Sequence, residues 1–535
     1  MTTRTRKKFK ANPPHPPELL NCLDDPSFIQ YYDRLDPRGF SKTSALLRDL
    51  AKVKQPEDIG AGVSVVALEE SKLPFEGLGS NFFFFRDFYD SLLQKIREFK
   101  RVVLLGNPGV GKSVFAYYYL WRMIRDKNEL PPDHTGNTKR PEVVLFQSGD
   151  KTFKCLFLSS LQAERVRCSD DELLSLMNPS SALYFFEPLS FHVEPHFNDL
   201  DVPTVAFCSP DERRYKEFCK NGGFQVYMPC WELEELLAVG TYIRNNDKNL
   251  SERNKELLSD ENIRYRFEKF GGIFRHVIPR DSDHVKRCEE SQDKAIAQLI
   301  HAPNLSELLS QSDIGPLEVS HWICQYDVAK ADLNAFKQHT LQFVNDNIRE
   351  RLKENMEKVD LDTRIAFLIR NDRVPTFKAN DSRMIYETVV RDLLLSNNGL
   401  DFEELDCSSN KAGEIKKAQR TICLAKHYPG HVSEKQLIED TLYCPVKSNE
   451  PVVDYLFRDG DKVYGIQVTR ASSKKKRTVK QSNLQNFFNQ LGLDPKSFVF
   501  CLVPSPSDAD SYKIDLEGYP EVKRMIWKLP QTYKN

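Results

Sequence analysis

The stretch RVVLLGNPGVGKSVFAYYYLW, residues 101–121, constrains the fold more than any other part of the sequence. Residues 106–113 match the pattern G-x-x-x-x-G-K-[ST] in full, between a short apolar run and a run with helical apolar periodicity. Glycines in such a loop let backbone N–H groups turn inward, and the start of the following helix adds a dipole that favours an anion. The stretch therefore predicts a strand, a phosphate-binding loop and a helix in succession.

The chemistry of this loop predicts a nucleotide site for ATP with Mg²⁺. Lys112 is expected to bridge the β- and γ-phosphates, and the Ser113 hydroxyl is expected to ligate the Mg²⁺. The backbone of the whole loop is expected to line the site, which comprises Gly106, Asn107, Pro108, Gly109, Val110, Gly111, Lys112 and Ser113. The alternative is a glycine turn that binds no ligand.

Three further side chains are candidates for the same site. Glu187 directly follows the apolar run ALYFF and is the candidate for the second acid near the Mg²⁺. Ser209 follows the run TVAFC and is a candidate polar contact to the γ-phosphate, and Arg275 follows a glycine pair in FEKFGGIFRHVI. A strand-end glutamate and a surface arginine without a binding role are the alternatives.

Six short apolar runs predict an α/β fold with a parallel sheet. Several of them are apolar at every position, which is typical of strands that helices cover on both faces. The runs are VVLL (102–105), VVLFQ (143–147), CLFLS (155–159), ALYFF (182–186), TVAFC (204–208) and QVYM (225–228). Helical patterns dominate after residue 232, beginning with WELEELLAVGTYIRNN.

The 535 residues exceed one ordinary core, and the sequence divides into four parts. We expect a polar N-terminal arm (1–58), a nucleotide-binding core (59–231), a helical extension (232–375) and a C-terminal α/β domain (376–535). Twelve cysteines without a CxxC pair signal neither a zinc site nor a disulfide framework. No apolar run is long enough to cross a membrane, and the N-terminus shows no secretory signal.

The C-terminal part contains a hairpin signal, because VVDYLFR and KVYGIQVTR flank Asp459-Gly460-Asp461. A two-residue loop at 459–460 pairs position 454 with 465, and a loop at 460–461 pairs position 454 with 467. Either loop places Asp454, Gln467 and Thr469 on one face of the sheet, whereas a three-residue loop without a bulge would put Gln467 on the other face.

An acid on one strand and a polar pair on the next are typical of restriction-enzyme-like nucleases, whose pattern is an acid, a hairpin and then acid-x-lysine. Glu387, on the polar side of the helical stretch SRMIYETVVRDLLL, is a candidate third Mg²⁺ ligand. Gln467 is neutral where the pattern has an acid, and Thr469 stands where it has lysine. The basic segment 470–480 is well placed to meet DNA phosphates, and Lys474 or Lys475 could supply the missing ammonium. A half-buried hairpin with an incidental Asp454 is the alternative.

In their order along the chain, the motifs resemble those of Crinkler effectors and trypanosome retrotransposon-hot-spot proteins. They are FFFFRDFYDSLLQKI, LLGNPGVGKSVFAYYYLW, CSPDERRYKEFCK, MPCWELEEL, FGGIFRHVI and YGIQVT, over roughly residues 75 to 500. The resemblance implies a P-loop NTPase of AAA/STAND type joined to a restriction-endonuclease-like domain. Glu187 then takes the Walker B role, where aspartate is usual, and the nuclease residues are Glu387, Asp454 and Gln467, with Thr469 completing a Gln-x-Thr element.

The resemblance further implies ATP-controlled, Mg²⁺-dependent cleavage of DNA in a nucleus, often that of a host after secretion, that leads to cell death. The translocation header with its Leu-Phe-Leu-Ala-Lys element is not found, so a resident nuclear protein is the alternative location. The alternative function is an NTP-switched signalling or scaffold protein with an inactive nuclease fold. A remodelling motor is a third class, and homo-oligomerisation stays open.

Overall fold

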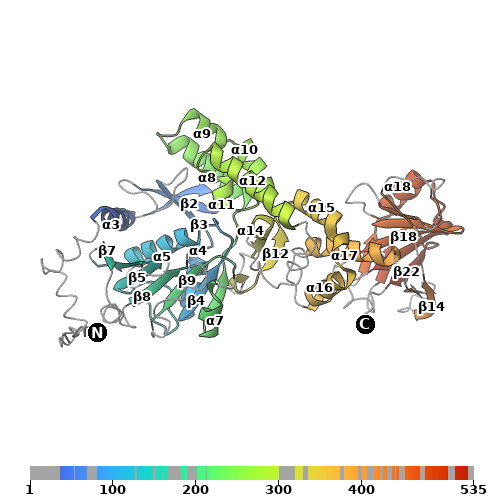
Figure 1. The fold of residues 1–535 in the computed structure, drawn as a ribbon, viewed down its shortest axis with the longest axis horizontal. Helices are drawn as coiled ribbons and strands as arrows, with labels where there is room; N and C mark the ends of the chain where they lie inside the picture. The colour runs from blue at the N-terminus through green and yellow to red at the C-terminus, as the bar shows by residue number, and fades with distance from the viewer. Residues whose placement is uncertain are drawn as a thin grey trace, which may run out of the picture. The chain divides into compact units, whose positions relative to one another are not determined.

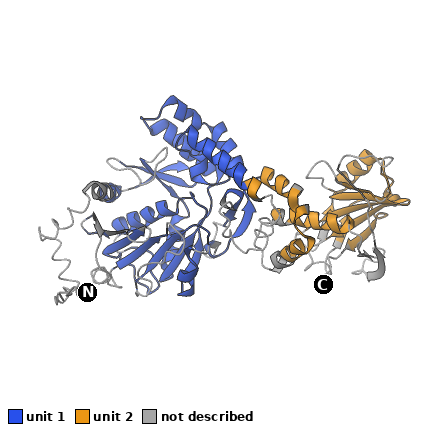
Figure 2. Ribbon diagram, in the orientation of Figure 1, with its two compact units in different colours: residues 1–295, 313–345 blue, residues 296–312, 346–535 orange. Residues whose placement is uncertain are grey.

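The chain forms two compact units, each of mixed α/β structure (Figure 2). One unit comprises residues 1–295 and 313–345, and the other comprises residues 296–312 and 346–535. The four-part division expected from the sequence stays a prediction. The computed structural model describes residues 37–53, 55–68, 81–126, 129–148, 152–159, 161–166, 182–188, 202–211, 214–299, 320–328, 335–373, 379–395, 401–405, 415–421, 426–429, 437–439, 441–444, 452–469, 476–503 and 513–527.

A seven-stranded sheet forms the centre of the first unit, in the order β10-β4-β9-β8-β5-β6-β7. The first five strands in this order are parallel, and all six apolar runs predicted as strands are strands. The bounds are β4 (Arg101–Leu105), β5 (Val143–Ser148), β6 (Thr152–Phe157), β7 (Gln162–Val166), β8 (Ala182–Glu187), β9 (Thr204–Cys208) and β10 (Phe224–Tyr227).

The expectation of a parallel sheet is wrong for the run at 155–159. It falls on β6, which pairs antiparallel with β5 and in turn with β7. Only residues 149–151 separate β5 from β6, and so short a connection can join antiparallel neighbours but not parallel ones, which need a crossover of a dozen or more residues.

Helices and a small sheet surround the central sheet (Figure 1). Helix α5 follows the loop after β4 and buries an apolar stripe that includes Phe115, Tyr119 and Met123. The elements are α3 (Pro37–Lys52), α4 (Tyr89–Arg97), α5 (Lys112–Asp126), α7 (Lys216–Lys220), and the antiparallel strands β1 (Glu57–Gly60), β2 (Val63–Ala67) and β3 (Phe82–Arg86).

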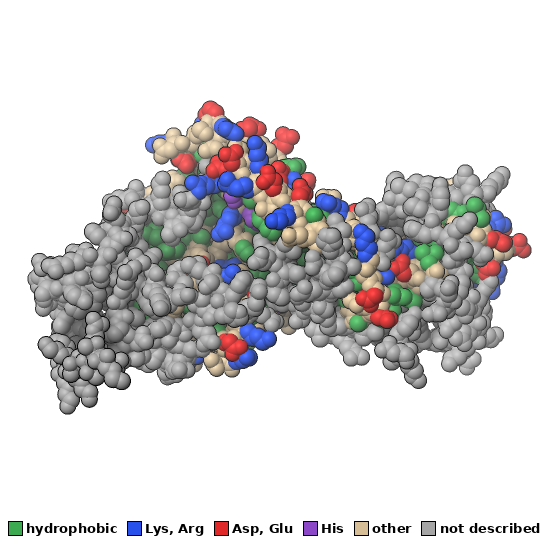
Figure 3. Space-filling model, viewed as in Figure 1, with side chains coloured by type: hydrophobic (Ala, Val, Ile, Leu, Met, Phe, Trp, Pro, Cys, Tyr) green, Lys and Arg blue, Asp and Glu red, His purple; other side chains and the backbone are tan. Residues whose placement is uncertain are grey.

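In the described residues between 232 and 373, helices predominate as predicted. A two-stranded antiparallel hairpin, β11 (Cys324–Asp327) with β12 (Thr340–Phe343), interrupts these helices. The helices are α8 (Leu233–Asn246), α9 (Glu252–Leu257), α10 (Asp260–Phe270), α11 (Phe274–Val277), α12 (Ser282–Leu299) and α14 (Ser320–Ile323), with a 3₁₀ turn at Ala335–Lys337. Positively and negatively charged side chains are interspersed over α9 and α10 (Figure 3), so the surface of these two helices is not a patch of a single charge.

A buried ion pair joins this region to the small sheet. Arg86, at the end of β3, donates from Nε and Nη2 to the two carboxylate oxygens of Glu235 on α8, over 3.0 and 2.7 Å. The guanidinium also lies over the rings of Phe88 and Trp231, and both charged side chains are at most 2 % exposed. Pairing and hydrogen bonding satisfy two charges that would otherwise be costly to bury.

An eight-stranded mixed sheet dominates the second unit, in the order β14-β13-β22-β20-β18-β17-β16-β15. Its strands are β13 (Asp401–Leu405), β14 (Ile415–Thr421), β15 (Lys426–Pro429), β16 (Thr441–Cys444), β17 (Tyr455–Asp459), β18 (Lys462–Val468), β20 (Phe498–Val503) and β22 (Lys523–Trp527). The other elements are α15 (Asp346–Asn355), α16 (Leu361–Arg373), α17 (Ala379–Leu395), α18 (Gln481–Leu491), 3₁₀ turns at Met356–Lys358 and Pro495–Ser497, and a parallel pair of β19 (Lys476–Val479) with β21 (Lys513–Leu516).

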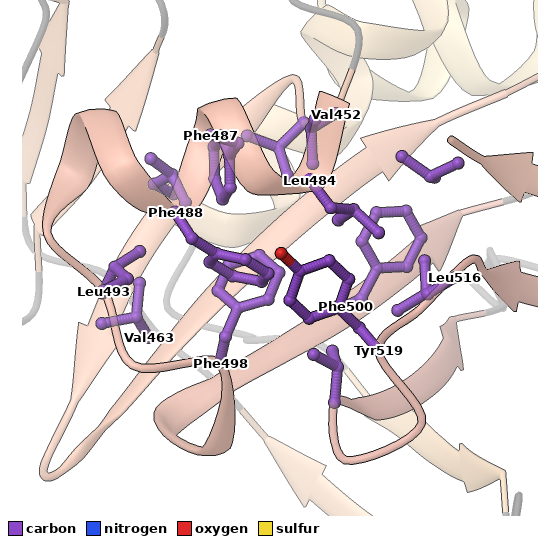
Figure 4. Close-up of a cluster of buried hydrophobic side chains, with 14 of the residues drawn as sticks. Val452, Val463, Leu484, Phe487, Phe488, Leu493, Phe498, Phe500, Leu516 and Tyr519 are labelled. Atoms are coloured by element: carbon purple, nitrogen blue, oxygen red, sulfur yellow. The ribbon is translucent and has the colours of Figure 1, made fainter. Parts of the chain in front are cut away.

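The core of this sheet lies under α18. Figure 4 shows Phe487 and Phe488 of the helix directed toward Phe498 of β20 and Tyr519. The ring centroids of Phe488 and Phe498 are 5.3 Å apart, and those of Phe488 and Tyr519 are 5.1 Å apart. This packing anchors β18 and β20 through Val463, Phe498 and Phe500, and α17 also contacts β18.

Candidate functional site

The glycine-rich loop connects β4 to α5, as the sequence predicts. Gly109 and Gly111 have φ of +88° and +107°, a region that residues with a Cβ rarely adopt. A Cβ on Gly109 would also lie 2.9 Å from the Cβ of Arg275. The backbone N–H of Phe115 donates to the carbonyl of Gly111 over 2.8 Å, which starts the helix immediately after the loop. The backbone conformation therefore favours glycine at positions 109 and 111.

The Lys112 ammonium lies against the loop. It donates to the carbonyl oxygens of Gly106 and Asn107 over 2.6 and 3.1 Å. Burial lowers the pKa of Lys112 from 10.5 to about 8, while the neighbouring Cys208 and Glu187 act in the opposite direction. A cation that is held this way at the start of a helix can meet phosphate oxygens with little loss of hydration.

Ser113 and Glu187 are brought together at the carboxyl edge of the sheet. The Ser113 hydroxyl donates to Glu187 Oε1 over 2.5 Å, although β9 separates the strand of Glu187 from β4. A hydroxyl and a carboxylate are hard oxygen ligands of the type that Mg²⁺ prefers, and Mg²⁺ sites commonly use one or two carboxylates plus phosphates. The pair therefore fits the ligand set expected for a nucleotide-bound Mg²⁺.

Ser209 and Arg275 also lie near the loop. Cys208 of β9 pairs with Leu105 of β4, so Ser209 follows at the same edge of the sheet as Gly106. The backbone N–H of Arg275 donates to the carbonyl of Gly109 over 3.3 Å, and its charge contributes to lowering the pKa of Lys112. The Arg275 side chain is exposed and begins beside the loop.

Two contacts to the loop were not predicted. Asn107 is fully buried: its Nδ2 donates to the carbonyl of Cys324, and its Oδ1 accepts from the N–H of Tyr326, each over 2.9 Å. The indole N–H of Trp231 donates to the carbonyl of Val110 over 2.9 Å. Trp231 lies in the motif MPCWELEEL. Nothing in the sequence of the loop indicates that β11 would contact Asn107.

The hairpin in the second unit has the register of the second alternative. Asp459 pairs with Lys462 and Tyr455 with Ile466, so the loop is 460–461, and Gly460 has φ of +58°. The paired residues end at Tyr455 and Ile466, and the backbone N–H of Asp454, immediately before β17, donates to the carbonyl of Ile466 over 2.7 Å. The shared face of Asp454, Gln467 and Thr469 stays a prediction, because Asp454 and Thr469 lie just outside the paired strands.

Glu387 and Asp454 converge on one guanidinium. Arg383 of α17 donates from Nε to Glu387 Oε1 over 2.9 Å and from Nη2 to Asp454 Oδ1 over 2.7 Å. The Lys353 ammonium donates to Glu387 Oε2 over 3.3 Å, and the N–H of Val468 donates to Asp454 Oδ2 over 2.7 Å. The helix-borne glutamate and the strand-borne aspartate thus share a cation.

The electrostatics of Asp454 reflect this crowding. Burial is the largest cause that raises the pKa of Asp454, to about 6, and the negative charge of Glu387 adds to it. The Arg383 guanidinium and the N–H of Val468 act in the opposite direction. Two carboxylates that repel each other and share one cation form a site at which a divalent cation would relieve the repulsion.

The remaining nuclease candidates are Gln467, Thr469 and the basic segment 470–480. Gln467 is 3 % exposed on β18, and the backbone N–H of Thr469 donates to the carbonyl of Val503 over 2.9 Å. Among the residues that the structure describes, no group of three or more His, Cys, Asp or Glu side chains could hold a metal. In the basic segment 470–480, residues 476–479 form β19, and Lys474 and Lys475 lie outside the described residues.

The donor set of the second unit fits Mg²⁺ with two carboxylates. Glu387 and Asp454 come from different elements, and both direct an oxygen at the same positive group. The amide oxygen of Gln467, on β18, is a further oxygen donor of a type that Mg²⁺ accepts. Glu387 and Asp454 would hold the ion, and Gln467 is the candidate third ligand.

With the fold and both sites described, the chain is a mixed α/β protein with a glycine-rich loop between a strand and a helix, and a paired-carboxylate site in a separate unit. No family model matches the sequence. Over 144 residues, or 26 % of this chain, the sequence is 31 % identical to Crinkler effector protein 15 of Phytophthora infestans. Crinkler effector protein 16 of the same organism matches to the same extent.

The matched part is a fraction of both proteins. The chain spans about a fifth of the length of the curated relatives it matches, since the aligned residues cover 20 % of each. The resemblance to Crinkler effectors noted from the motifs is thereby confirmed as a partial similarity. Among the described residues, no helix combines the length and the apolar character needed to cross a membrane.

Proposed function

We propose that this chain is an ATP-binding P-loop protein of AAA/STAND type that controls a Mg²⁺-dependent DNA nuclease with a restriction-endonuclease-like fold. The observation that carries the nuclease part is the convergence of Glu387 and Asp454 on one cation. The nucleotide part rests on the conformation of the loop and on the contact between Ser113 and Glu187.

In the nucleotide site, the role of the residues would be to bind and orient the phosphates of ATP. Loop N–H groups and the Lys112 ammonium would contact phosphate oxygens, and Ser113 and Glu187 would hold the Mg²⁺. The ion would neutralise charge that develops on the transferring phosphoryl group. Glu187 would also orient or deprotonate a water, so the proposal includes hydrolysis as well as binding.

In the nuclease site, the reaction is hydrolysis of a phosphodiester. A water oxygen forms a new bond to phosphorus, and one P–O ester bond breaks. The two protons of the water are shared between the departing hydroxyl and the phosphomonoester. Glu387 and Asp454 would hold a Mg²⁺ that polarises the phosphodiester and makes the water more acidic. Their burial excludes bulk water and strengthens the interactions within the site.

A second function remains a candidate: an NTP-switched signalling or scaffold protein with an inactive nuclease fold. The observation that favours it is the neutral pair Gln467 and Thr469, which stand in place of an acid and a lysine. An amide ligates a divalent ion more weakly than a carboxylate does. The two candidates differ in whether purified protein breaks a phosphodiester.

The plasmid assay separates the two candidates. Purified full chain is incubated with supercoiled plasmid and Mg²⁺, with and without ATP, alongside Asp454→Ala and Lys112→Ala. We expect nicking by the wild type that is lost in Asp454→Ala and that no longer responds to ATP in Lys112→Ala. Arg458→Ala is the matched control, since Arg458 lies on β17 of the same hairpin and donates to the carbonyl of Gly460. No nicking under any nucleotide condition would favour the scaffold.

The partial similarity to Crinkler effectors supports an effector-like role. We propose that the protein acts on DNA in a nucleus, either that of a host or its own, and that the cleavage promotes cell death. Fluorescently tagged wild type and Asp454→Ala, expressed in plant cells, test this. Nuclear signal for both proteins with cell death for the wild type only is the expected result; equal cell death for both would separate the effect from DNA cleavage.

A further inference from the structure

The nuclease proposal does not say which positive side chain contacts the phosphate of the substrate. Restriction-enzyme-like sites have a lysine beside their acids, and Thr469, at that position, carries no charge. The substrate is a phosphodiester anion, and its negative charge must be met by a group that touches it. A positive side chain must therefore come from elsewhere in the unit.

Arg383 meets the geometric requirement. Residues 383 and 387 are four apart on α17, which places both side chains on the face of the helix that meets Asp454. The guanidinium is within hydrogen-bonding distance of both expected metal ligands. Its side chain is 39 % exposed, whereas those of Glu387 and Asp454 are 14 % and 10 % exposed. A solvent-borne phosphate can reach the arginine from outside.

The charges at the site would allow Arg383 to exchange its two carboxylate partners for a phosphate. Glu387, Asp454, Arg383 and Lys353 sum to zero net charge. A divalent ion would compete with the guanidinium for the same two carboxylate oxygens, and a guanidinium that loses this contact stays within one side-chain length of them. Its planar fork matches two oxygens of a phosphate as well as it matches carboxylates.

We propose, building on the nuclease proposed above, that Arg383 is the phosphate-binding residue of this site and supplies the positive charge that Thr469 lacks. In the free protein it pairs with Glu387 and Asp454, and in the complex with DNA it contacts the non-bridging oxygens of the phosphate held beside them. Lys353 donates to the other oxygen of Glu387 and stays with that carboxylate.

The test measures DNA binding and metal binding separately from cleavage. Binding of a fluorescein-labelled duplex to the full chain is followed by anisotropy as a function of salt, with saturating Ca²⁺ so that the carboxylates are neutralised by the ion. Arg383→Ala should weaken binding about tenfold or more, and the slope of log K against log salt should lose about 0.9. Arg383→Lys should restore the slope but only part of the affinity, and Arg458→Ala should leave both unchanged.

Manganese binding, followed by electron paramagnetic resonance, is the second measurement. Arg383→Ala should bind Mn²⁺ as tightly as the wild type or more tightly, because a competing cation has been removed, whereas Asp454→Asn should lose affinity. An unchanged salt slope in Arg383→Ala overturns the proposal. Loss of Mn²⁺ binding in Arg383→Ala also overturns it, since the arginine would then only position the carboxylates.

The outcomes keep the two proposals apart. A wild type that nicks plasmid while Arg383→Ala retains the wild-type slope leaves the nuclease standing and removes the phosphate contact. A wild type that never nicks plasmid, with a slope that falls in Arg383→Ala, supports the phosphate contact on an inactive nuclease fold.

Discussion

Asn107→Ala should loosen the contact between the glycine-rich loop and β11. The Asn107 side chain forms hydrogen bonds along the edge of β11, because Cys324 and Tyr326 present a carbonyl and an N–H on the side of β11 that faces it. Truncation removes the two hydrogen bonds that Asn107 makes with the backbone groups of Cys324 and Tyr326. At roughly 1 to 2 kcal/mol for each group, the local opening free energy of this edge should fall by about 2–4 kcal/mol.

Amide hydrogen exchange measures this locally, which suits a chain with two units better than a single unfolding transition. The loss converts to an exchange rate at Tyr326 that is about 30-fold to 1,000-fold faster, at 1.4 kcal/mol per tenfold. The matched control is Asn246→Ala, whose amide donates to the carbonyl of Tyr242 at an exposed position. Exchange at Tyr326 that rises less than about threefold would refute the argument that these two bonds hold the edge.

Three further changes test other parts of the structure. Glu187→Gln should leave nucleotide binding intact but reduce Mg²⁺-dependent ATP hydrolysis by about 100-fold, measured as phosphate release; equal rates would remove Glu187 from the site. Glu235→Ala should cost about 3–5 kcal/mol in urea unfolding followed by tryptophan fluorescence, because the buried Arg86 guanidinium loses its carboxylate partner. Glu252→Ala, in an exposed pair with Lys255, should change little. Gly465→Ala should lower the midpoint of thermal unfolding of the second unit, because its Cβ would lie 2.3 Å from Phe498 Cζ; an unchanged midpoint would mean that this ring can move aside at no cost.

The features that local patterns encode were predictable. The apolar runs could be predicted as strands because a run of apolar residues indicates burial whichever elements cover it. Asp459-Gly460-Asp461 indicated the hairpin, but the choice between loops at 459–460 and 460–461 came from the structure. The shared face of Asp454 and Gln467 rests on counting along the two strands and stays a prediction, because the paired residues end at Tyr455 and Ile466. The polar side of α17 then indicated Glu387, which the structure places beside Asp454 through Arg383.

The features that depend on distant partners were not predictable. The four residues of β11, CQYD, are too few and too mixed in polarity to indicate a strand, and its pairing with β12 is decided by packing. The antiparallel direction of β6 depends on how short its connection to β5 is, and not on its own composition. Arg383 lies on a helix face that the sequence shows only as polar. The sequence therefore could not show whether its side chain contacts acidic side chains or solvent.

The contact of Asn107 with β11 also bears on how the protein is made. Its two partners lie 217 and 219 residues further along the chain. At a synthesis rate of about 5–20 residues per second, the ribosome needs roughly 10–40 s after Asn107 to deliver them. The nascent chain must therefore carry an incompletely braced loop through that interval, and a release from the ribosome before residue 326 would yield a protein whose glycine-rich loop never acquires its final support.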